Sequence, residues 1–461
     1  MPVQDALQHY QKSRAAHLED LKRLVRIPSV SAAGFDAAPV RRSAEAVAAL
    51  LRERGLENVE LIELPGAHPY VYGDWLHAPG KPTVLLYAHH DVQPLGRADV
   101  WKTPPFEPTV GADGRLYGRG AADDKAGVVA HTATVASWLQ ADGKLPVNVK
   151  VIIEGEEEIG SAHLFEFIQK FQQKLQADVM VLTDAGNWDT GIPALTIALR
   201  GIVVVEVELH ALETPLHSGM WGGPIPDPVM GLSRLLATLV DDKGRIAIPG
   251  LYDDVRPLTA AERKEFERLP TTPEEFRRQS KMLPGVQLLG DWITPWQAIW
   301  REPSLTVSAF QAASRAQAAN IICDYAWAQI SVRVVPDQEP ERVQEQLVAY
   351  LKKNVPWGME ARIKAGDHTA SWWTTDPTGP VFDKARTALT RGYGREPLMI
   401  GCGGSIPFVD PFARALGGVP ALLVGVEDPY TNAHAENESL HLGDFDKAVA
   451  SQIHLLALLA E

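Results

Sequence analysis

Acidic residues and histidines recur in this sequence at the points where short apolar runs end. The six segments are YAHHD at 87–91, DDK at 123–125, GEEE at 155–158, LTDA at 182–185, LHSG at 216–219 and NAHAEN at 432–437. One acidic ending means little alone. Several that converge at the carboxyl edge of a parallel sheet would supply ligands for two metal ions. The sequence therefore predicts a dinuclear metal site.

The first segment places a histidine two positions before an acid. His89 and Asp91 follow the apolar run 84–87 and share one face of an extended chain, whereas His90 points the other way. A ligating imidazole usually donates its second N–H to a carboxylate. We therefore expect His89 to bind metal and Asp91 to hold the imidazole; the alternative is a polar strand end without a metal.

The second segment lies at the start of a predicted helix. Asp123 and Asp124 precede apolar residues at helical spacing over 126–139, and an acid in this place is first of all an N-cap. We assign the cap to Asp124. Asp123, behind the tight turn at 118–122, fits a carboxylate that bridges two ions, although a DD pair alone is more often a cap.

Three adjacent glutamates follow the strand predicted at 149–153: Glu156, Glu157 and Glu158. Their like charges repel, and cations would relieve that repulsion. Hydrolysis by a metal-activated water needs one acid as a ligand and another as a general base, which two neighbouring glutamates can supply. The alternative is an acid-rich first helical turn at solvent.

Two further residues complete the set. Asp184 ends the strand predicted at 179–182, and His434 lies in a polar loop after the strand predicted at 421–426. Both fall at the edge where open α/β sheets bind ligands. Each could be an ordinary loop residue. The probability that all five such positions in one sheet are unrelated to a metal site is small, because the separate probabilities multiply, so the metal interpretation is favoured.

An α/β pattern positions these residues. Short apolar or alternating runs predict strands at 69–75, 83–87, 147–153, 178–182 and 421–426, and helical periodicity recurs at 4–26, 126–140, 162–175, 381–390 and 445–459. Strands that are apolar throughout are buried on both faces. We therefore expect a mostly parallel sheet with helices on both faces.

The pattern changes from about residue 201. Alternating strands at 203–209 and 328–335 flank a charged, proline-punctuated stretch at 253–278, and the α/β pattern returns after about residue 369. We predict a catalytic domain in two parts, residues 1–200 and 369–461, interrupted by a smaller α+β domain at residues 201–368.

Composition excludes several classes of protein. The 461 residues contain 58 Asp and Glu against 44 Lys and Arg, a formal charge of −14, so no basic surface for nucleic acid or anionic lipid is expected. No apolar run resembles a signal or membrane span, and we expect a cytoplasmic protein. Its two cysteines, Cys323 and Cys402, form no disulfide framework or zinc cluster, so oxygen and imidazole must hold any metal.

The ordered motifs resemble those of the M20 metallopeptidases, especially the carnosinase-like cytosolic dipeptidases. The motifs cover most of the chain and are YAHHDVQP, LYGRGAADDK, EGEEEIGS, TDA, LHSG, SVRVVP, GGSIP and AHAENE. The resemblance implies that His89, Asp123 and Asp184 hold one ion. It implies that Asp123, Glu158 and His434 hold the other, with Asp123 bridging the two ions.

The resemblance also implies a mechanism. Glu157 would be the general base, Asp91 would clamp His89, and a cis peptide bond would join Asp123 to Asp124. The predicted reaction hydrolyses the amide bond of a dipeptide or similar small amino-acid amide. In it, Glu157 takes a proton from a metal-bridging water and passes it to the leaving amine. Two divalent ions per subunit are expected, with Zn preferred over Mn or Co.

In this family the inserted domain is a lid that also forms the dimer contact. The resemblance implies a homodimer in which His217 reaches the neighbouring active site and stabilises the charge of the tetrahedral intermediate. Arg333 would bind the terminal carboxylate of the substrate, helped by Gly404 and Ser405. The alternative for His217 is a histidine that only forms part of a turn, and the alternative for Arg333 is a solvent-exposed arginine on a strand; neither would bind substrate.

One departure from the family pattern affects the substrate. Gly401 and Cys402 stand where the carnosinase-like pattern has Arg-Glu, and that Glu is the expected partner of the free amino group of the substrate. Its absence puts recognition of an unblocked N-terminus in doubt. An N-acyl amino acid deacylase or exo-carboxypeptidase therefore remains an alternative, as does a catalytically inactive dimeric binding protein, against which the full set of predicted ligands argues.

Overall fold

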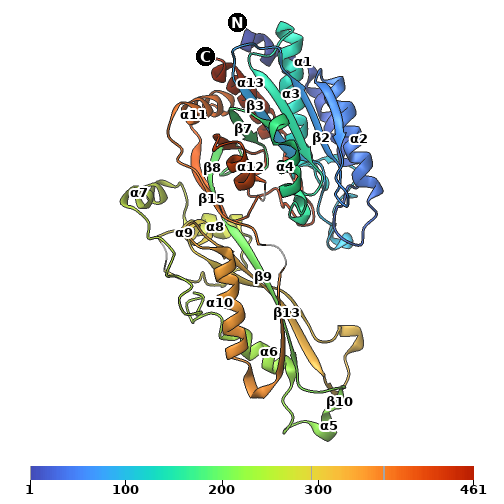
Figure 1. The fold of residues 1–461 in the computed structure, drawn as a ribbon, viewed down its shortest axis with the longest axis vertical. Helices are drawn as coiled ribbons and strands as arrows, with labels where there is room; N and C mark the ends of the chain where they lie inside the picture. Colours follow the sequence, from blue (N-terminus) through green and yellow to red (C-terminus); the bar gives the residue numbers. More distant parts are fainter. Residues whose placement is uncertain (1, 292, 367–368, 407) are drawn as a thin grey trace. The chain divides into compact units, whose positions relative to one another are not determined.

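A computed structural model describes residues 2–291, 293–366, 369–406 and 408–461. The chain forms two compact units (Figure 1). The first unit contains residues 1–197, 375–400 and 406–461, and the second contains residues 198–374 and 401–405. The sequence-based boundary between 368 and 369 falls on a residue outside the described set.

The first unit is built on a sheet with the strand order β1-β2-β6-β3-β7-β17-β8. The strands are β1 (Glu57–Ile62), β2 (Tyr70–Trp75), β6 (Asn148–Glu154), β3 (Thr83–His89), β7 (Val179–Leu182), β17 (Ala421–Leu423) and β8 (Ala194–Leu199). The four central strands β6, β3, β7 and β17 are parallel, and the outer pairs are antiparallel. The predicted α/β fold with a mostly parallel central sheet is confirmed.

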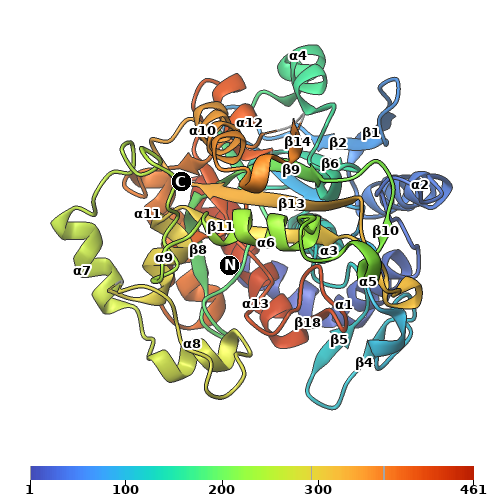
Figure 2. The same cartoon turned by 90° about the horizontal axis from the view of Figure 1, so that it is seen from below.

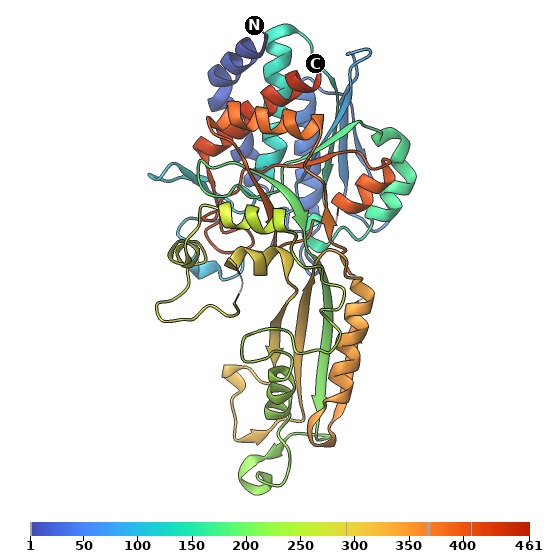
Figure 3. The same ribbon diagram turned by 90° about the vertical axis from the view of Figure 1, so that its left-hand side faces the viewer.

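Helices cover both faces of this sheet (Figure 3) because its central strands are apolar on both sides. In β3, Leu86 and Ala88 enter a core shared with α1 (Pro2–Val25), α2 (Ala38–Glu53), α3 (Lys125–Asp142), α11 (Pro380–Tyr393) and α13 (Leu442–Leu459). Tyr87 points to the opposite face and stacks on Phe408, at a ring-centroid distance of 3.7 Å. The helices α4 (Leu164–Leu175) and α12 (Val409–Ala415) pack together.

A small sheet ties the loops of the first unit together. Its strand order is β18-β5-β4, with β18 (Ser439–His441), β5 (Arg115–Tyr117) and β4 (Thr109–Val110). This pairing brings the segment that follows His434 beside the segment that precedes Asp123. Two motifs that lie more than 300 positions apart in the sequence are therefore neighbours.

The second unit contains a four-stranded antiparallel sheet with the order β11-β13-β9-β14. Its strands are β11 (Ser304–Gln311), β13 (Tyr325–Val334), β9 (Gly201–His210) and β14 (Glu360–Ala365). Burial alternates along β9 and β13, as expected for strands with one covered face. The helices α6 (Pro228–Ala237) and α10 (Pro340–Lys353) cover that face, and Figure 2 shows α6 against β13.

Shorter elements complete the second unit. They are β10 (Leu216–His217), α5 (Ser218–Trp221), β12 (Ile321–Ile322), α7 (Ala260–Arg268), α8 (Pro273–Gln279), α9 (Pro295–Arg301) and β15 (Trp373–Thr374). The strand β16 (Leu398–Cys402) has residues in both units. The charged, proline-punctuated stretch 253–278, for which no helix was predicted, contains the starts of two helices capped by Thr259 and Thr272. Among the described residues, every helix is too short or too polar to span a bilayer.

Candidate metal centre

The parallel strands of the first unit end at one edge of the sheet. His89 is paired with Glu154 across β3 and β6, and Tyr87 with Leu182 across β3 and β7. Residues that follow these strands therefore emerge side by side. This register brings the acids after β6 and β7 next to the histidine that ends β3.

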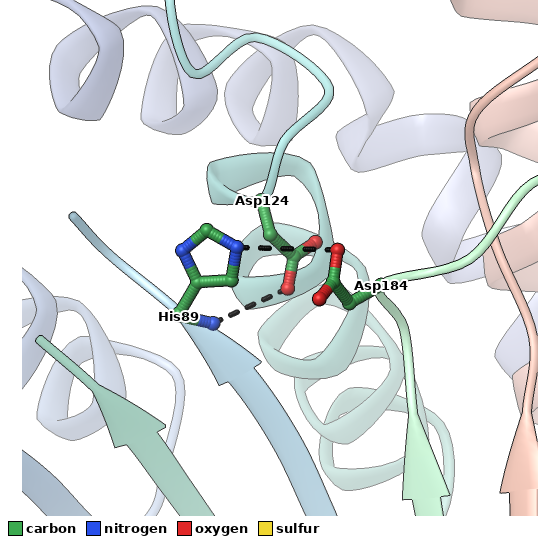
Figure 4. A group of neighbouring side chains, drawn as sticks. All are labelled: His89, Asp124 and Asp184. Atoms are coloured by element: carbon green, nitrogen blue, oxygen red, sulfur yellow. Dashed lines mark hydrogen bonds and ion pairs between the residues drawn. The ribbon is translucent and has the colours of Figure 1, made fainter. Parts of the chain in front are cut away.

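His89 is buried and has acids on both sides of its ring. Its Nε2 lies 3.0 Å from Asp123 Oδ1 and 3.9 Å from Asp184 Oδ1, the latter contact being drawn in Figure 4. Its Nδ1 lies 3.1 Å from the backbone oxygen of Asp91 and 3.3 Å from Asp91 Oδ1. One ring nitrogen thus faces Asp91 and the other faces the carboxylates of Asp123 and Asp184.

Asp91 is itself fixed by two donors. Its Oδ2 accepts hydrogen bonds from the Ser31 hydroxyl at 2.7 Å and from the Glu158 backbone N–H at 3.1 Å. Oδ1 is buried and accepts no hydrogen bond from the described residues. The carboxylate is therefore held beside the His89 ring with one oxygen turned towards it, as a residue that orients an imidazole requires.

A second group of ligand-type atoms adjoins the first. His434 Nε2 lies 3.1 Å from Asp123 Oδ2 and 3.2 Å from Glu158 Oε2. Glu158 is held by Gln93, whose backbone N–H and side-chain amide both donate to its carboxylate. His434 has a left-handed backbone (φ 62°) and a side chain that is 59% exposed. The two oxygens of Asp123 thus face different histidines.

Asp124 is the N-cap of α3, as predicted. Its Oδ1 accepts from the Gly127 N–H at 3.1 Å and its Oδ2 accepts from the His89 N–H at 3.2 Å. It also lies with His89 and Asp184 in one of two groups whose atoms are close enough to hold an ion, and the other group is Asp123, Glu158 and His434. The predicted cis bond joins Asp123 to Asp124.

The carboxylates of this centre strongly influence one another. Burial and the Asp123 charge raise the pKa of Glu158 to about 7, and burial raises that of Asp184 to about 6. Burial and the Asp184 charge raise the pKa of Glu157 well above its usual range. Hydrogen bonds to Asp123 and Glu158 raise the pKa of His434 to about 11. These crowded oxygens and two imidazoles are a donor set that suits divalent cations.

The three adjacent glutamates separate into different roles. Glu156 turns away from the centre and accepts from the His68 N–H and the His163 ring, each at 3.0 Å. Glu158 faces His434. The Glu157 carboxylate is influenced by burial and by neighbouring charges and accepts no hydrogen bond from the part of the chain that the structure describes, so its oxygens are available to a water or substrate.

Two buried glutamates were missed from the sequence. Glu154, inside β6, accepts from the Tyr87 hydroxyl at 2.9 Å. Glu438 accepts from Arg119 and from the backbone N–H groups of Gly120, Ala122 and Asp123. Glu438 therefore holds the turn that presents Asp123, and its place in the AHAENE motif was the only signal for it.

The remaining predicted site residues lie in the second unit. Arg333 on β13 donates to the Ser405 hydroxyl at 3.5 Å, and the Gly404 N–H donates to Cys402 Sγ. His217 is exposed on β10, and its Nδ1 accepts from the Gly219 N–H at 3.1 Å. The structure brings Arg333 to the glycine-rich turn. Among the described residues, the His217 ring bonds only within its own turn, and the His217 backbone pairs with Ile321 of β12.

The packing of the glycine-rich turn explains why position 401 is a glycine and not the arginine of the family pattern. A Cβ at Gly401 would lie 2.6 Å from Cγ of Trp300, and one at Gly403 would lie 2.7 Å from Cγ2 of Ile299. Arg200 donates to the Gly403 carbonyl at 3.0 Å. No arginine fits at 401 while Trp300 fills this space. Pro407 of the motif lies outside the described residues.

An α/β sheet with two adjoining clusters of carboxylates and histidines at its carboxyl edge defines a metal-dependent hydrolase. The chain belongs to peptidase family M20/M25/M40, whose family model matches residues 85–458. The predicted M20 family and the prediction of an enzyme are confirmed.

Several relatives support this assignment. The chain is 33% identical over 378 residues to a cysteinylglycine-S-conjugate dipeptidase of Corynebacterium striatum, covering 81% of this chain and 80% of that one. It is similar to human carnosine dipeptidase 1, with a TM-score of 0.90 at 27% identity, covering 100% and 99% of the two chains. The metallo-carboxypeptidase Sso-CP2 of Sulfolobus solfataricus gives a TM-score of 0.84 at 30% identity, covering 96% and 99%.

Proposed function

We propose that this protein is a dipeptidase that binds two divalent ions per subunit, bridged by Asp123. The observation that carries the proposal is the division of the Asp123 carboxylate, with Oδ1 3.0 Å from His89 and Oδ2 3.1 Å from His434. A carboxylate that faces two imidazoles through different oxygens is suited to hold two ions at once.

One ion would be held by His89, Asp123 and Asp184, and the other by Asp123, Glu158 and His434. We prefer Asp123 to Asp124 as the acid that joins His89. Both oxygens of Asp124 already accept backbone N–H groups, whereas Asp123 Oδ1 directly faces His89 Nε2. Zinc is proposed because nitrogen and carboxylate ligands suit it, with manganese and cobalt as alternatives.

Bound divalent ions supply a polarised carbonyl group and an acidified water. The residues of the chain supply the proton transfers and the orientation. Glu157 would accept a proton from the attacking water at its carboxylate and donate it to the nitrogen of the leaving amine. Asp91 would hold the His89 ring in place, since its carboxylate is fixed by Ser31 and by the Glu158 N–H.

Relatives named for dipeptides support the substrate class. They include Cys-Gly metallodipeptidases of yeasts and beta-Ala-His dipeptidases of mammals. A dipeptide ends in a carboxylate, and Arg333 beside Ser405 and Gly404 would bind it. The likeness to Sso-CP2, named a metallo-carboxypeptidase, keeps exo-carboxypeptidase activity as the second candidate.

We also propose a homodimer in which the second unit acts as a lid and His217 of one subunit serves the site of the other. Exposed apolar side chains around His217 support this proposal: Met220 is 76% exposed, Trp221 51% and Ile321 39%. Apolar side chains gathered at one surface favour association with another protein surface. A cytoplasmic location remains a prediction from composition.

The decisive experiment combines metal analysis with Glu157→Gln. Chelator-treated protein should be inactive on alanyl-glycine and regain activity with zinc, manganese or cobalt. Glu157→Gln should retain two ions per subunit and lose about 10²- to 10⁴-fold in kcat. The control is Glu166→Gln, the same change at an exposed position of α4, which should leave kcat unchanged. A metal-loaded enzyme without dipeptidase activity, or an active Glu157→Gln, would contradict the proposal.

A further inference from the structure

We propose that Glu427 binds the free amino group of the substrate and so sets the specificity for unblocked dipeptides. This inference rests on the proposed dipeptidase function. It assigns the partner of the amino group to the first unit, whereas Cys402, which stands where the family pattern has that glutamate, belongs to the second unit.

Glu427 lies at the same sheet edge as the metal-ligand residues. The parallel strands β7 and β17 are paired at Leu182 and Leu423, and the pairing resumes beyond them in a bridge between Gly186 and Glu427. The Asn187 N–H donates to the Glu427 carbonyl at 2.8 Å. These contacts fix the Glu427 backbone beside residues 186 and 187, which closely follow Asp184 after the end of β7.

The Glu427 carboxylate has a buried oxygen without a partner. Oε1 is inaccessible to solvent and accepts no hydrogen bond from the described residues. The neighbouring Asp428 is different, because Arg115 donates to both of its oxygens at 2.8 Å and Thr190 donates to one. A buried carboxylate oxygen without a hydrogen-bond donor costs free energy. A ligand that donates a hydrogen bond to Glu427 Oε1 would remove this cost.

The charges around Glu427 favour a cationic partner. Burial and the charges of Asp123, Asp184 and Glu438 raise the pKa of Glu427 well above its usual range, and His434 acts in the opposite direction. Glu427 belongs to neither group of candidate metal ligands among the described residues. An ammonium group is positively charged and has N–H groups. It can therefore pair with the Glu427 carboxylate and donate the hydrogen bond that Oε1 does not receive from the described residues.

The chemistry of the substrate identifies that ammonium. In an unblocked dipeptide the amino group is bonded to the carbon next to the scissile carbonyl. A carbonyl placed for attack near Asp123 and Glu157 therefore puts the ammonium within a few ångströms of the same edge. On the 401–405 turn, Cys402 provides no carboxylate, and Trp300 fills the space beside Gly401. A substrate without an amino group would leave Oε1 unpaired, and an N-acylated one would offer it only an uncharged amide N–H.

Two matched substrates test the inference. Alanyl-glycine and its des-amino analogue propionyl-glycine share the scissile amide and the terminal carboxylate, and they differ only in the ammonium group. For the zinc-loaded full-length protein we expect kcat/KM to favour alanyl-glycine by at least about 100-fold. Glu427→Gln should reduce this ratio to below about 10-fold, through loss on alanyl-glycine alone.

Three variants separate recognition from structure. Glu427→Asp keeps the charge and should recover part of the ratio. Glu396→Gln makes the same change at an exposed position and should leave the ratio unchanged. Metal content and Tm of each variant verify folding. If Glu427→Gln slows both substrates equally, or if the wild type cleaves both equally, the inference is wrong while the dipeptidase function stands. If the zinc-loaded wild type cleaves neither, both fail.

Discussion

At the scale of single residues, the centre is a set of acids whose protonation opposes metal binding. Ligands must lose their protons to bind an ion. Glu158 and Asp184 have pKa values raised to about 7 and about 6, and that of His434 is raised to about 11. Protons and metal ions therefore compete for the same side chains across the neutral range.

This competition predicts how stability depends on pH. An acid with a raised pKa in the folded protein holds its proton while the unfolded chain ionises, so the metal-free protein loses stability as pH rises from about 4 to about 7. The raised pKa of His434 acts in the same direction at higher pH, because stability present below the unfolded pKa of histidine is lost as pH rises through the folded pKa. Bound ions reverse the trend.

We therefore expect the Tm difference between zinc-loaded and chelator-treated protein to grow with pH. Thermal unfolding followed by fluorescence at about pH 5.5 and about pH 8 should show a gap wider by roughly 5 °C at the higher pH. The comparison cancels the general effect of net charge. A gap that stays constant with pH would show that these side chains do not exchange protons for ions.

Single residues also show what the sequence can reveal about a site. His89 and Asp184 could be selected because each follows an apolar run, and Asp123 because it lies between a tight turn and a predicted helix; such positions are visible in the sequence. Glu427 and Glu438 could not, because their surroundings depend on which strands are neighbours. The unpaired Oε1 of Glu427 and the four groups that donate to Glu438 are visible only in the folded structure.

At the scale of elements, apolar strands were predicted well because burial on both faces imposes a composition. The exceptions are informative. β17 ends at Leu423, earlier than predicted. A Cβ at Gly425 would lie 1.3 Å from the Ala185 carbonyl oxygen, so the backbone segments that follow β17 and β7 are in close contact there. The helices α7 and α8 were missed because short, exposed helices depend on their caps more than on an apolar face.

The turn before α3 depends on a glutamate from the other end of the chain. Glu438 is fully buried, pairs with Arg119 at 2.7 Å and accepts three backbone N–H groups. Glu438→Ala would leave Arg119 as a buried charge without its partner and should cost about 3–5 kcal/mol. It should also lower metal content, because the Asp123 N–H loses its acceptor. Urea unfolding and metal analysis measure the two effects.

The same loop provides the control for this variant. Glu436 pairs with Arg97, whose side chain is 73% exposed. Because exposed ion pairs are screened by solvent, Glu436→Ala should leave the stability nearly unchanged and both ions in place. Equal losses of stability for the two variants would mean that the buried Glu438 does not anchor the turn.

At the scale of the whole molecule, the predicted residues are divided between two compact units. The candidate metal ligands and Glu157 belong to the first unit, whereas His217, Arg333 and Ser405 belong to the second. The prediction of an inserted domain came from the change from apolar to alternating strands in the sequence. Sequence patterning contains no information on whether the second unit serves its own subunit or a neighbour.

Subunit mixing answers that question for His217. His217→Ala alone should lower kcat by about 10²- to 10³-fold, because a donor to the developing oxyanion is lost. In a dimer that combines a Glu157→Gln subunit with a His217→Ala subunit, one site regains both Glu157 and a His217 from its partner. Random mixing of equal amounts makes half of the dimers mixed, each with one working site, so about one quarter of wild-type activity should return. If His217 serves its own subunit, each site in every mixed dimer lacks one of the two groups, and mixing restores nothing.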